Sequence, residues 1–440
     1  MDATRRDFLK LGTALLATVG AVNLSGCGSG PGAAASGGVI PLQFSFWGSS
    51  VRAGRTTQAI QLYQQQHPHT TISTWFSSFG QYWPKLATQI SGGSAPDFIQ
   101  MDMRYIDQYV KKGLLLDLSK YTSGPIDLHD FNQVLLKGSE AEGVVYGVPF
   151  GGNFVGIFYD ADLLKQAGVA IPAQTPNWTW DTFAEYTLRI SKALGPGVYG
   201  TEDASSNIGA LEIFVRQRGK ELFTNAGQRA FSQQDMQDWF GYWDNLRKSG
   251  ACCTTNLETQ YNGSTPALTT LVAGKAAINV STSNQIQAYQ AATTHKLGLC
   301  TPPMTAGLRD TGNYLKASML MSASATTKYP SEVTQFINYL FNNNAAIKAL
   351  GIERAIPGSA RAQALLKPTL KPADLDQLNV TNQVAATSRP KLVLDPPGAG
   401  EVGDLLTLIA QGAGFGKMSV AEAARSFVEQ TDKALERDGV

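Results

Sequence analysis

The stretch GGSAPDFIQMD, residues 92–102, holds the features that decide the fold. Two glycines and a proline precede the apolar pair Phe98-Ile99, and this short apolar segment ends at Asp102. Glycine and proline are typical of turns, and a short apolar run bounded by turn residues is typical of a buried strand. We therefore expect a turn over 92–97 and a strand that ends at 100–102.

Strands and helices alternate on both sides of this stretch. Residues 41–48 and 70–76 have the pattern of strands, and each is followed by a helical pattern. The same order recurs at 155–168, where a strand leads into the helix DADLLKQAG. Such alternation favours an α/β layer architecture with parallel strands. Later segments, 331–341 and 419–436, have the spacing of amphipathic helices.

The length of the chain predicts more than one domain. At 440 residues, it is long for a single hydrophobic core, so we expect two domains. The segment VPFGG, residues 148–152, combines a proline with two glycines and must turn sharply. We place a crossing between domains there.

The N-terminal residues predict export. Two adjacent arginines followed by an apolar run (11–24) resemble a twin-arginine signal, and the run is shorter than the roughly 20 residues of a membrane span. LSGC, which ends at Cys27, resembles the lipobox of bacterial lipoproteins. We expect residues 1–26 to be removed and Cys27 to carry lipid, so that the flexible segment 27–40 tethers the protein to the outer face of the cytoplasmic membrane. A plain signal peptide with a chance cysteine is the alternative.

The charge of the mature chain excludes one class of function. Charged residues make up 16% of the sequence, below the roughly 25% of an average protein. Without residues 1–26, basic and acidic residues are equal in number, and no Lys or Arg cluster is present. Such a chain is not expected to bind nucleic acid.

Three cysteines remain after export: Cys252, Cys253 and Cys300. An extracytoplasmic compartment permits a disulfide between Cys300 and one of the adjacent pair. Free, buried thiols are the alternative, and the spacing is not that of a metal site.

Several segments together resemble the family 1 extracellular solute-binding proteins, the sugar-binding lipoproteins of ABC importers. In order along the chain, they are WG (47–48), QYWPKLATQISGGSAPDFIQMD (81–102), YVKKGLLLDLSKY (109–121), VYGVPFGGNFVGIFYDADLLKQAGVAIP (145–172), NWTWDTFAEYTLRI (177–190), LVAGKAAINV (271–280) and SEVTQFINYLFNNNAAIKAL (331–350). The resemblance is specific as a set, covers about residues 40 to 360, and is loose beyond them.

The resemblance implies a two-lobed α/β periplasmic-binding-protein fold of type II-like form, with the ligand in a cleft between lobes joined by a hinge. Lobe 1 is expected to comprise 41–150 and 305–380, and lobe 2 to comprise 151–304 and 381–440. The family implies a carbohydrate ligand, closure of the lobes around it, and delivery to the transmembrane subunits of an ABC permease. It implies no enzymatic activity, no cofactor and no metal.

A sugar has apolar ring faces and many hydroxyls, so its site needs aromatic side chains and hydrogen-bonding groups. In an α/β sheet, these belong at the carboxyl ends of the strands. Trp47, Ser49 and Asp102 follow predicted strands, and the remaining candidates rest on the resemblance. The predicted ligand-binding residues are Trp47, Ser49, Asp102, Phe150, Asn153, Asn284 and Tyr314.

Each candidate also has a structural interpretation. Trp47 would be buried between strand and helix, Asp102 would cap the following helix, and Tyr314 would pack at a strand edge. Asp97, at the start of the strand, is expected to be structural. Arg52 is expected to be a solvated surface charge.

Weaker candidates lie elsewhere along the chain. Asp203, Asn207 and Trp178 are held at low weight as ligand contacts. Asn284 stands where the family often has an aromatic residue, which favours hydrogen bonding over stacking at that wall.

Two other functions remain open. A secreted carbohydrate-active enzyme would need two facing carboxylates, such as Asp102 with Asp203, but no G-x-S-x-G or H-E-x-x-H motif is present. The same fold with a glycerol phosphodiester or another small metabolite as ligand is the second alternative.

Overall fold

The computed structural model describes residues 38–141, 143–171, 177–261, 263–308, 310–387 and 393–438. The contacts divide the chain into Met1–Gly38 and the compact unit Val39–Val440. The predicted signal peptide, the lipidation site Cys27 and the tether up to residue 37 lie outside the described residues, so they stay predictions.

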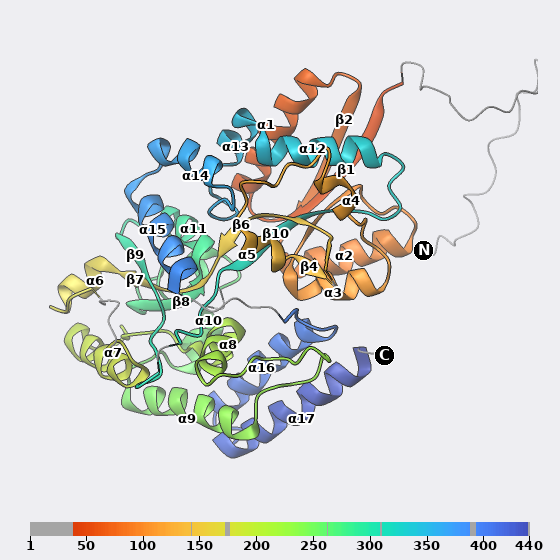
Figure 1. Ribbon diagram of the computed structural model, residues 1–440. Coiled ribbons are helices and arrows are strands. Elements are labelled where there is room, and N and C mark those ends of the chain that lie inside the picture. Colours follow the sequence, from red (N-terminus) through yellow and green to blue (C-terminus); the bar gives the residue numbers. More distant parts are fainter. Residues whose placement is uncertain are drawn as a thin grey trace, which may run out of the picture. The chain divides into compact units, whose positions relative to one another are not determined.

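The helices predicted after the first two strands and at 160–168, 331–341 and 419–436 are present, and further helices lie between them (Figure 1). They are α1 (Ser50–Gln66), α2 (Phe79–Ser91), α3 (Met103–Lys111), α4 (Ser119–Thr122), α5 (Gln133–Lys137), α6 (Ala161–Gln166), α7 (Trp180–Leu194), α8 (Ile208–Gln217), α9 (Gln233–Ser249), α10 (Thr255–Gln260), α11 (Ile286–Ala291), α12 (Pro330–Asn342), α13 (Asn344–Leu350), α14 (Ala360–Leu366), α15 (Pro372–Thr387), α16 (Ala399–Gly414) and α17 (Val420–Asp438). Short 3₁₀ turns are η1 (Ala204–Ser206), η2 (Pro266–Leu268), η3 (Ser283–Gln285) and η4 (Lys367–Thr369).

The first sheet has five strands in the order β2-β1-β3-β10-β6. β1 (Ile40–Trp47) pairs in parallel with β2 (Thr70–Ser77) and β3 (Phe98–Met101). β10 (Lys316–Ala323) runs antiparallel to β3 and to β6 (Val148–Asn153). The predicted parallel α/β arrangement is therefore confirmed for β1, β2 and β3, and β10 inserts from far along the chain.

The stretch that decides the fold behaves as predicted. All four residues of β3 are buried, and the strand ends at Asp102. The turn before it includes Gly93, whose φ of 70° favours glycine. The structural role expected for Asp97 is confirmed, because its carboxylate accepts hydrogen bonds from Gln43 N (2.9 Å) and Thr327 Oγ1 (2.7 Å).

The second sheet has three strands in the order β8-β7-β9. β7 (Val155–Asp160) runs antiparallel to both β8 (Ile278–Thr282) and β9 (Leu297–Cys300). A short hairpin, β4 (Glu140–Ala141) with β5 (Val144–Val145), precedes β6. The chain thus passes from the first sheet to the second between β6 and β7, two residues after the predicted crossing at 148–152.

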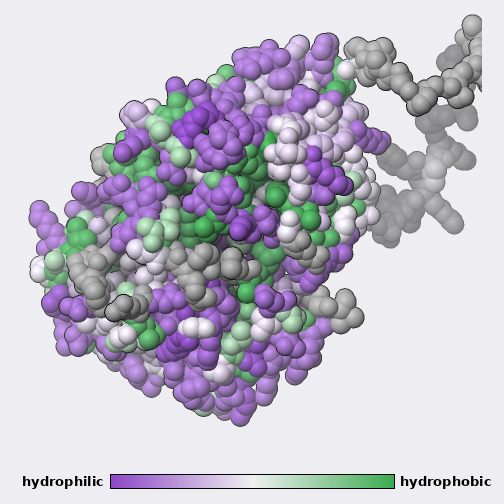
Figure 2. Space-filling model, viewed as in Figure 1, coloured by the Kyte–Doolittle hydropathy of each residue, from purple (hydrophilic) through white to green (hydrophobic). Residues whose placement is uncertain are grey.

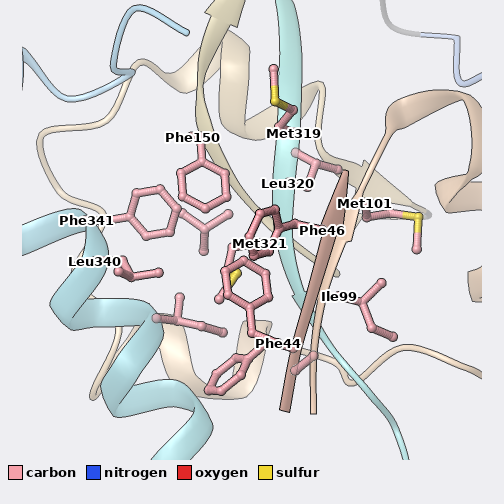
Figure 3. Packing of buried hydrophobic residues seen from close by; sticks show 14 of the residues in the cluster. Phe44, Phe46, Ile99, Met101, Phe150, Met319, Leu320, Met321, Leu340 and Phe341 are labelled. Atoms are coloured by element: carbon pink, nitrogen blue, oxygen red, sulfur yellow. The ribbon is translucent and has the colours of Figure 1, made fainter. Parts of the chain in front are cut away.

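The apolar core around the first sheet is built by side chains from both faces of its strands and from α12. Phe44 and Phe46 of β1 are fully buried and belong to the same cluster as Leu320 and Met321 of β10 (Figure 3). Phe150 of β6 lies against Phe341 of α12, with ring centroids 5.0 Å apart. Burying large aromatic side chains in this way is the main stabilising term of such a core.

The core around the second sheet depends on aromatic residues of α9. Trp239 and Trp243 are fully buried, and α9 packs against α17, which itself packs against α16 (Figure 1). Trp178 and Trp180 belong to this core as well, and the Trp178 indole donates to Thr301 O (3.2 Å). Trp178, a low-weight ligand candidate, is therefore a core residue with a satisfied donor.

Helix α15 contributes side chains to two separate apolar clusters. Val384 lies in the cluster of Phe154 and Phe158, and Leu378 lies in the cluster of Ile347. The lobe boundary predicted between residues 380 and 381 falls inside this helix. The division into lobes stays a prediction, and α15 is the element whose assignment to one lobe is least clear from the contacts.

The surface shown in Figure 2 is mainly hydrophilic, with hydrophobic residues gathered toward the middle of the view.

Cys252, Cys253 and Cys300 are free and buried, so the alternative of buried thiols holds in this structure. Within the described ranges, no helix combines the length and apolar character that crossing a bilayer requires.

Asp97→Ala is predicted to lower the free energy of unfolding by about 2 kcal/mol, because it leaves Gln43 N and Thr327 Oγ1 without their acceptor. Urea denaturation followed by circular dichroism measures the change. The matched control is Asp376→Ala on the exposed face of α15, which is expected to stay within about 0.5 kcal/mol of the wild type. Equal stability of the two variants would contradict the structural role of Asp97.

Candidate functional site

The carboxyl end of β3 carries a partly buried charge cluster. Asp102 caps α3 by accepting from Arg104 N (2.9 Å), and it also accepts from Lys316 Nζ (3.2 Å) at the start of β10. Burial alone would raise the pKa of Asp102, but the charges of Lys316 and Arg104 and their hydrogen bonds hold it below its usual value. Asp102 therefore stays ionised. It caps α3, as the structural interpretation expects, and it also pairs with Lys316.

Arg104 joins this cluster to residues far along the chain. Burial opposes its charge, but the neighbouring charges of Asp102, Asp395 and Glu212 raise the pKa of Arg104. Glu212 lies on α8, and Asp395 precedes α16. Helices α3 and α16 contact each other, so one cation lies among carboxylates from three separate segments.

Tyr314 is fixed to α8 rather than free at a strand edge. Its hydroxyl donates to Glu212 Oε2 (2.9 Å), and the Arg216 guanidinium lies 4.8 Å from the centre of its ring. Arg216 also donates to Gly312 O (2.8 Å) and pairs with Glu221. The segment that precedes β10 is thus held against α8 by the Tyr314 hydroxyl and by the hydrogen bond from Arg216 to Gly312 O.

Asn153 joins three segments at the point where the chain changes sheet. Its amide donates to Ser318 Oγ (2.8 Å) and to Arg354 O (3.0 Å), and its Oδ1 accepts from Ser283 Oγ (3.3 Å). The side chain is 2% exposed. Phe150, from the same strand, lies under the Arg354 guanidinium at 4.7 Å.

Gly151 and Gly152 serve the packing of this junction. A Cβ at Gly151 would lie 2.0 Å from Ile356 O, and one at Gly152 would lie 2.5 Å from the Leu315 side chain. The two glycines therefore allow other parts of the protein's own chain to approach closely.

Trp47 is buried against α2, with its ring 5.3 Å from those of Phe79 and Tyr82. Ser49 is exposed and caps α1. The expectation that Arg52 is a solvated charge is wrong, because it is 5% exposed, pairs with Glu353 and donates to Trp47 O (2.9 Å). The loop after β1 is thus held by a buried guanidinium.

The remaining candidates lie around the second sheet. Asn284 is a partly exposed residue of η3. Asp203 and Asn207 cap η1 and α8, and both line a cavity of about 370 Å³. Its lining comprises Glu202, Asp203, Ala204, Ser205, Ser206, Asn207, Thr255, Glu258, Tyr261, Gly263, Thr269, Asn279, Val280, Ser281, Tyr289, Thr407, Ala410 and Gln411.

This cavity has the size and chemistry of a small-molecule site. Pockets for small ligands start at roughly 300 Å³ and combine apolar surface with a few directed polar groups. Here two tyrosines supply aromatic surface, and carboxylates, amides and hydroxyls supply hydrogen-bonding groups. None of the seven predicted ligand-binding residues is among its described lining residues, whereas the low-weight candidates Asp203 and Asn207 are.

Sequence reasoning missed several charged residues of the site. Lys316 has a signal, since it interrupts the apolar start of the strand LKASML. Glu202 adjoins the named candidate Asp203. Glu212 and Glu258 sit in ordinary helical patterns, and only the fold brings them to the site.

Comparison with known proteins places the chain among bacterial binding proteins. A lactose-binding protein from Rhizobium radiobacter is 25% identical over 186 residues, which is 41% of this chain and 42% of that protein. An extracellular solute-binding protein family 1 structure from Alicyclobacillus acidocaldarius is 28% identical and covers 91% of this chain and 100% of its own, with a TM-score of 0.70. A periplasmic solute-binding protein from Pectobacterium atrosepticum has a TM-score of 0.81 at 24% identity, with 91% and 100% coverage.

The alignment with the lactose-binding protein covers 42% of that protein's length. The two solved structures are covered over their full length. The predicted α/β fold of the periplasmic binding proteins is confirmed by these structural neighbours. The model of the bacterial extracellular solute-binding protein family matches residues 47–347, well over half of the chain, and the protein belongs to that family.

Proposed function

We propose that this protein is the substrate-binding lipoprotein of an ABC importer, which captures a sugar or an oligosaccharide and delivers it to a membrane permease without catalysing a reaction. The observation that carries the proposal is the cavity of about 370 Å³, lined by tyrosines, carboxylates, amides and hydroxyls beside strand ends. These groups meet the needs of a ligand with many hydroxyls and apolar ring faces. The lactose-binding relative supports the carbohydrate class.

The roles proposed for individual residues follow from their surroundings. Ser49, Asn284 and Asp102 are polar and close to strand ends, so we assign them direct contacts with ligand hydroxyls. Trp47, Phe150 and Asn153 are buried among protein groups, so their proposed contribution is to hold the site's loops in place. Tyr314 is assigned to the contact between the β10 segment and α8.

Delivery to a permease requires two states that the ligand distinguishes. The passage between β6 and β7 is one place for a hinge, since Phe154 lies between the two sheets, and the return of the chain from β9 to β10 is another. A ligand that binds both sides of that passage would favour the closed state.

A phosphodiester ligand is the less favourable alternative. A phosphate group needs Arg or Lys side chains that are not already paired. The described lining of the cavity contains neither residue, and Lys316 at the neighbouring cluster is paired with Asp102.

A thermal-shift screen of the purified protein tests the ligand class. Neutral mono- and oligosaccharides are compared with glycerol phosphodiesters, and binding to the folded state raises the melting temperature. A carbohydrate is expected to give the largest rise. If only a phosphodiester raises the melting temperature, the carbohydrate proposal fails, and turnover of an oligosaccharide would refute the non-enzymatic role.

Asp102→Asn is predicted to weaken carbohydrate binding roughly tenfold, because hydrogen bonds to a charged acceptor are worth more than those to a neutral one. Asn is also a good helix cap, but the variant loses the ion pair with Lys316, so melting curves must show that it is folded at the temperature of the measurement. Isothermal titration calorimetry measures the affinity. Asp107→Asn, one turn along α3 and paired with Lys111, is the matched control and should bind as the wild type does.

Cys27→Ser is predicted to release the protein from the membrane fraction, because the serine has no thiol to lipidate. Fractionation of cells and immunoblotting give the distribution. Ser36→Ala, in the same tether, is the control and should leave the protein in the membrane fraction. An unchanged distribution of the Cys27 variant would exclude lipid anchoring at that residue.

A further inference from the structure

Arg104 differs from the other arginines that the structure describes. Its backbone N–H donates to Asp102, but its guanidinium forms neither a hydrogen bond nor an ion pair within the described residues. Every other described arginine that is buried or half-buried donates to an acceptor of the protein, and these are Arg52, Arg55, Arg216, Arg218, Arg229, Arg247 and Arg354. A guanidinium is a donor at all three nitrogens, so Arg104 has several N–H groups without a protein acceptor.

These open donors face accessible space. The Arg104 side chain is half-buried, and its nitrogens are not among the buried polar atoms that lack a partner in the described chain. The same is true of one oxygen of Asp102, because Arg104 N and Lys316 Nζ both donate to Oδ1, while Oδ2 has no partner and is not a buried atom. Open donors and an open acceptor thus lie two residues apart at the carboxyl end of β3.

Arg104 lies where α3 meets elements that surround the second sheet. Helices α3 and α16 contact each other (Figure 1), and a Cβ at Gly400 of α16 would lie 3.0 Å from Tyr105 Oη. Glu212 of α8 and Asp395, which precedes α16, are close enough to interact with the charge of Arg104. A ligand group bound to Arg104 would therefore be near elements of both predicted lobes, as closure around a ligand requires.

The charge of the guanidinium is already compensated, although its donors are open. The carboxylates of Asp102, Glu212 and Asp395 interact with it electrostatically. A ligand carboxylate at this place would add a negative charge beside these three, and placing like charges together is unfavourable. A hydroxyl adds no charge, its oxygen accepts from a guanidinium, and its hydrogen can donate to a carboxylate.

We propose that Arg104 is a ligand-binding residue that selects neutral sugars over sugar acids, with its guanidinium donating to one ligand hydroxyl and Asp102 Oδ2 accepting from a neighbouring one. The inference rests on the proposed carbohydrate-binding function and specifies the ligand class at this end of β3. Two adjacent hydroxyls of one sugar ring serve both groups, since each hydroxyl donates one hydrogen bond and accepts others.

The ligand class is tested by isothermal titration calorimetry of the purified full-length protein. The neutral ligands are glucose, galactose, lactose and the neutral carbohydrate that gives the largest rise in the thermal-shift screen, and the acids are glucuronic, galacturonic and digalacturonic acid. Glucose and glucuronic acid differ only at C6, as do galactose and galacturonic acid. The tightest neutral sugar is expected to bind at least roughly tenfold more tightly than any of the acids.

Two variants test the role of Arg104 with that tightest neutral sugar. Arg104→Met removes the donors and is expected to weaken binding roughly tenfold. Arg104→Lys keeps the charge but loses the planar fork of donors, and it is expected to weaken binding about fivefold. The melting temperature of Arg104→Lys should equal that of the wild type, because the guanidinium donates no hydrogen bond to the described chain. Arg425→Lys, exposed on α17, is the matched control and should bind as the wild type does.

Four outcomes would overturn the inference or its basis. Wild-type affinity in both Arg104 variants would show that this residue does not contact the ligand. Weaker binding by Arg104→Lys together with a lower melting temperature would assign Arg104 a structural role. A sugar acid that binds as tightly as the tightest neutral sugar would refute the selectivity and leave carbohydrate binding intact. Absence of binding by any carbohydrate, here and in the thermal-shift screen, would refute the proposed function itself.

Discussion

The passage of the chain from the first sheet to the second depends on the amide of Asn153. The chain leaves the first sheet at this residue and joins the second at Val155, and the buried amide bonds to Ser318, to Arg354 O and to Ser283. Breaking one of these bonds would leave a buried polar group unsatisfied, which costs more than the bond itself contributes. Gly151 and Gly152 add a steric constraint, because a methyl group at either would overlap Ile356 or Leu315. The end of β6 is therefore positioned by the amide of Asn153 and by the lack of side chains at Gly151 and Gly152.

This chain has few charged residues for its length, yet it gathers several of them in one buried region. Asp102, Arg104 and Lys316 come from α3 and β10, while Glu212 and Asp395 come from elements more than a hundred residues apart. Each charge has an opposite neighbour, so burial does not force any of them into the neutral form. A polar surface with fixed, compensated charges keeps its hydrogen-bonding directions without the side-chain mobility that ordinary surface charges have.

The sequence predicted the parts of the fold that depend on local patterns. The turn at 92–97, the strand ending at Asp102 and the α/β order follow from spacing, and the structure has all three. The crossing was displaced by about two residues, because pairing of Asn153 with Lys316 extends β6, and such pairing is invisible in a local pattern. Arg52 was taken for a surface charge because its partner, Glu353, lies three hundred positions away. Glu258 gave no signal, since its electrostatic interaction with Glu202 exists only in the folded chain.

The two polar regions differ in what they require of a ligand. At the end of β3 the charges are balanced by Lys316 and Arg104, so a neutral group with hydroxyls can replace water there at little electrostatic cost. In the cavity, burial raises the pKa of Glu202 and Glu258, so these carboxyl groups are held toward the neutral form. A neutral carboxyl group can donate one hydrogen bond and accept others, as a ligand hydroxyl can. Selectivity among similar sugars would then arise from the directions in which the groups of each region donate and accept, because a misplaced hydroxyl leaves a buried group unpaired.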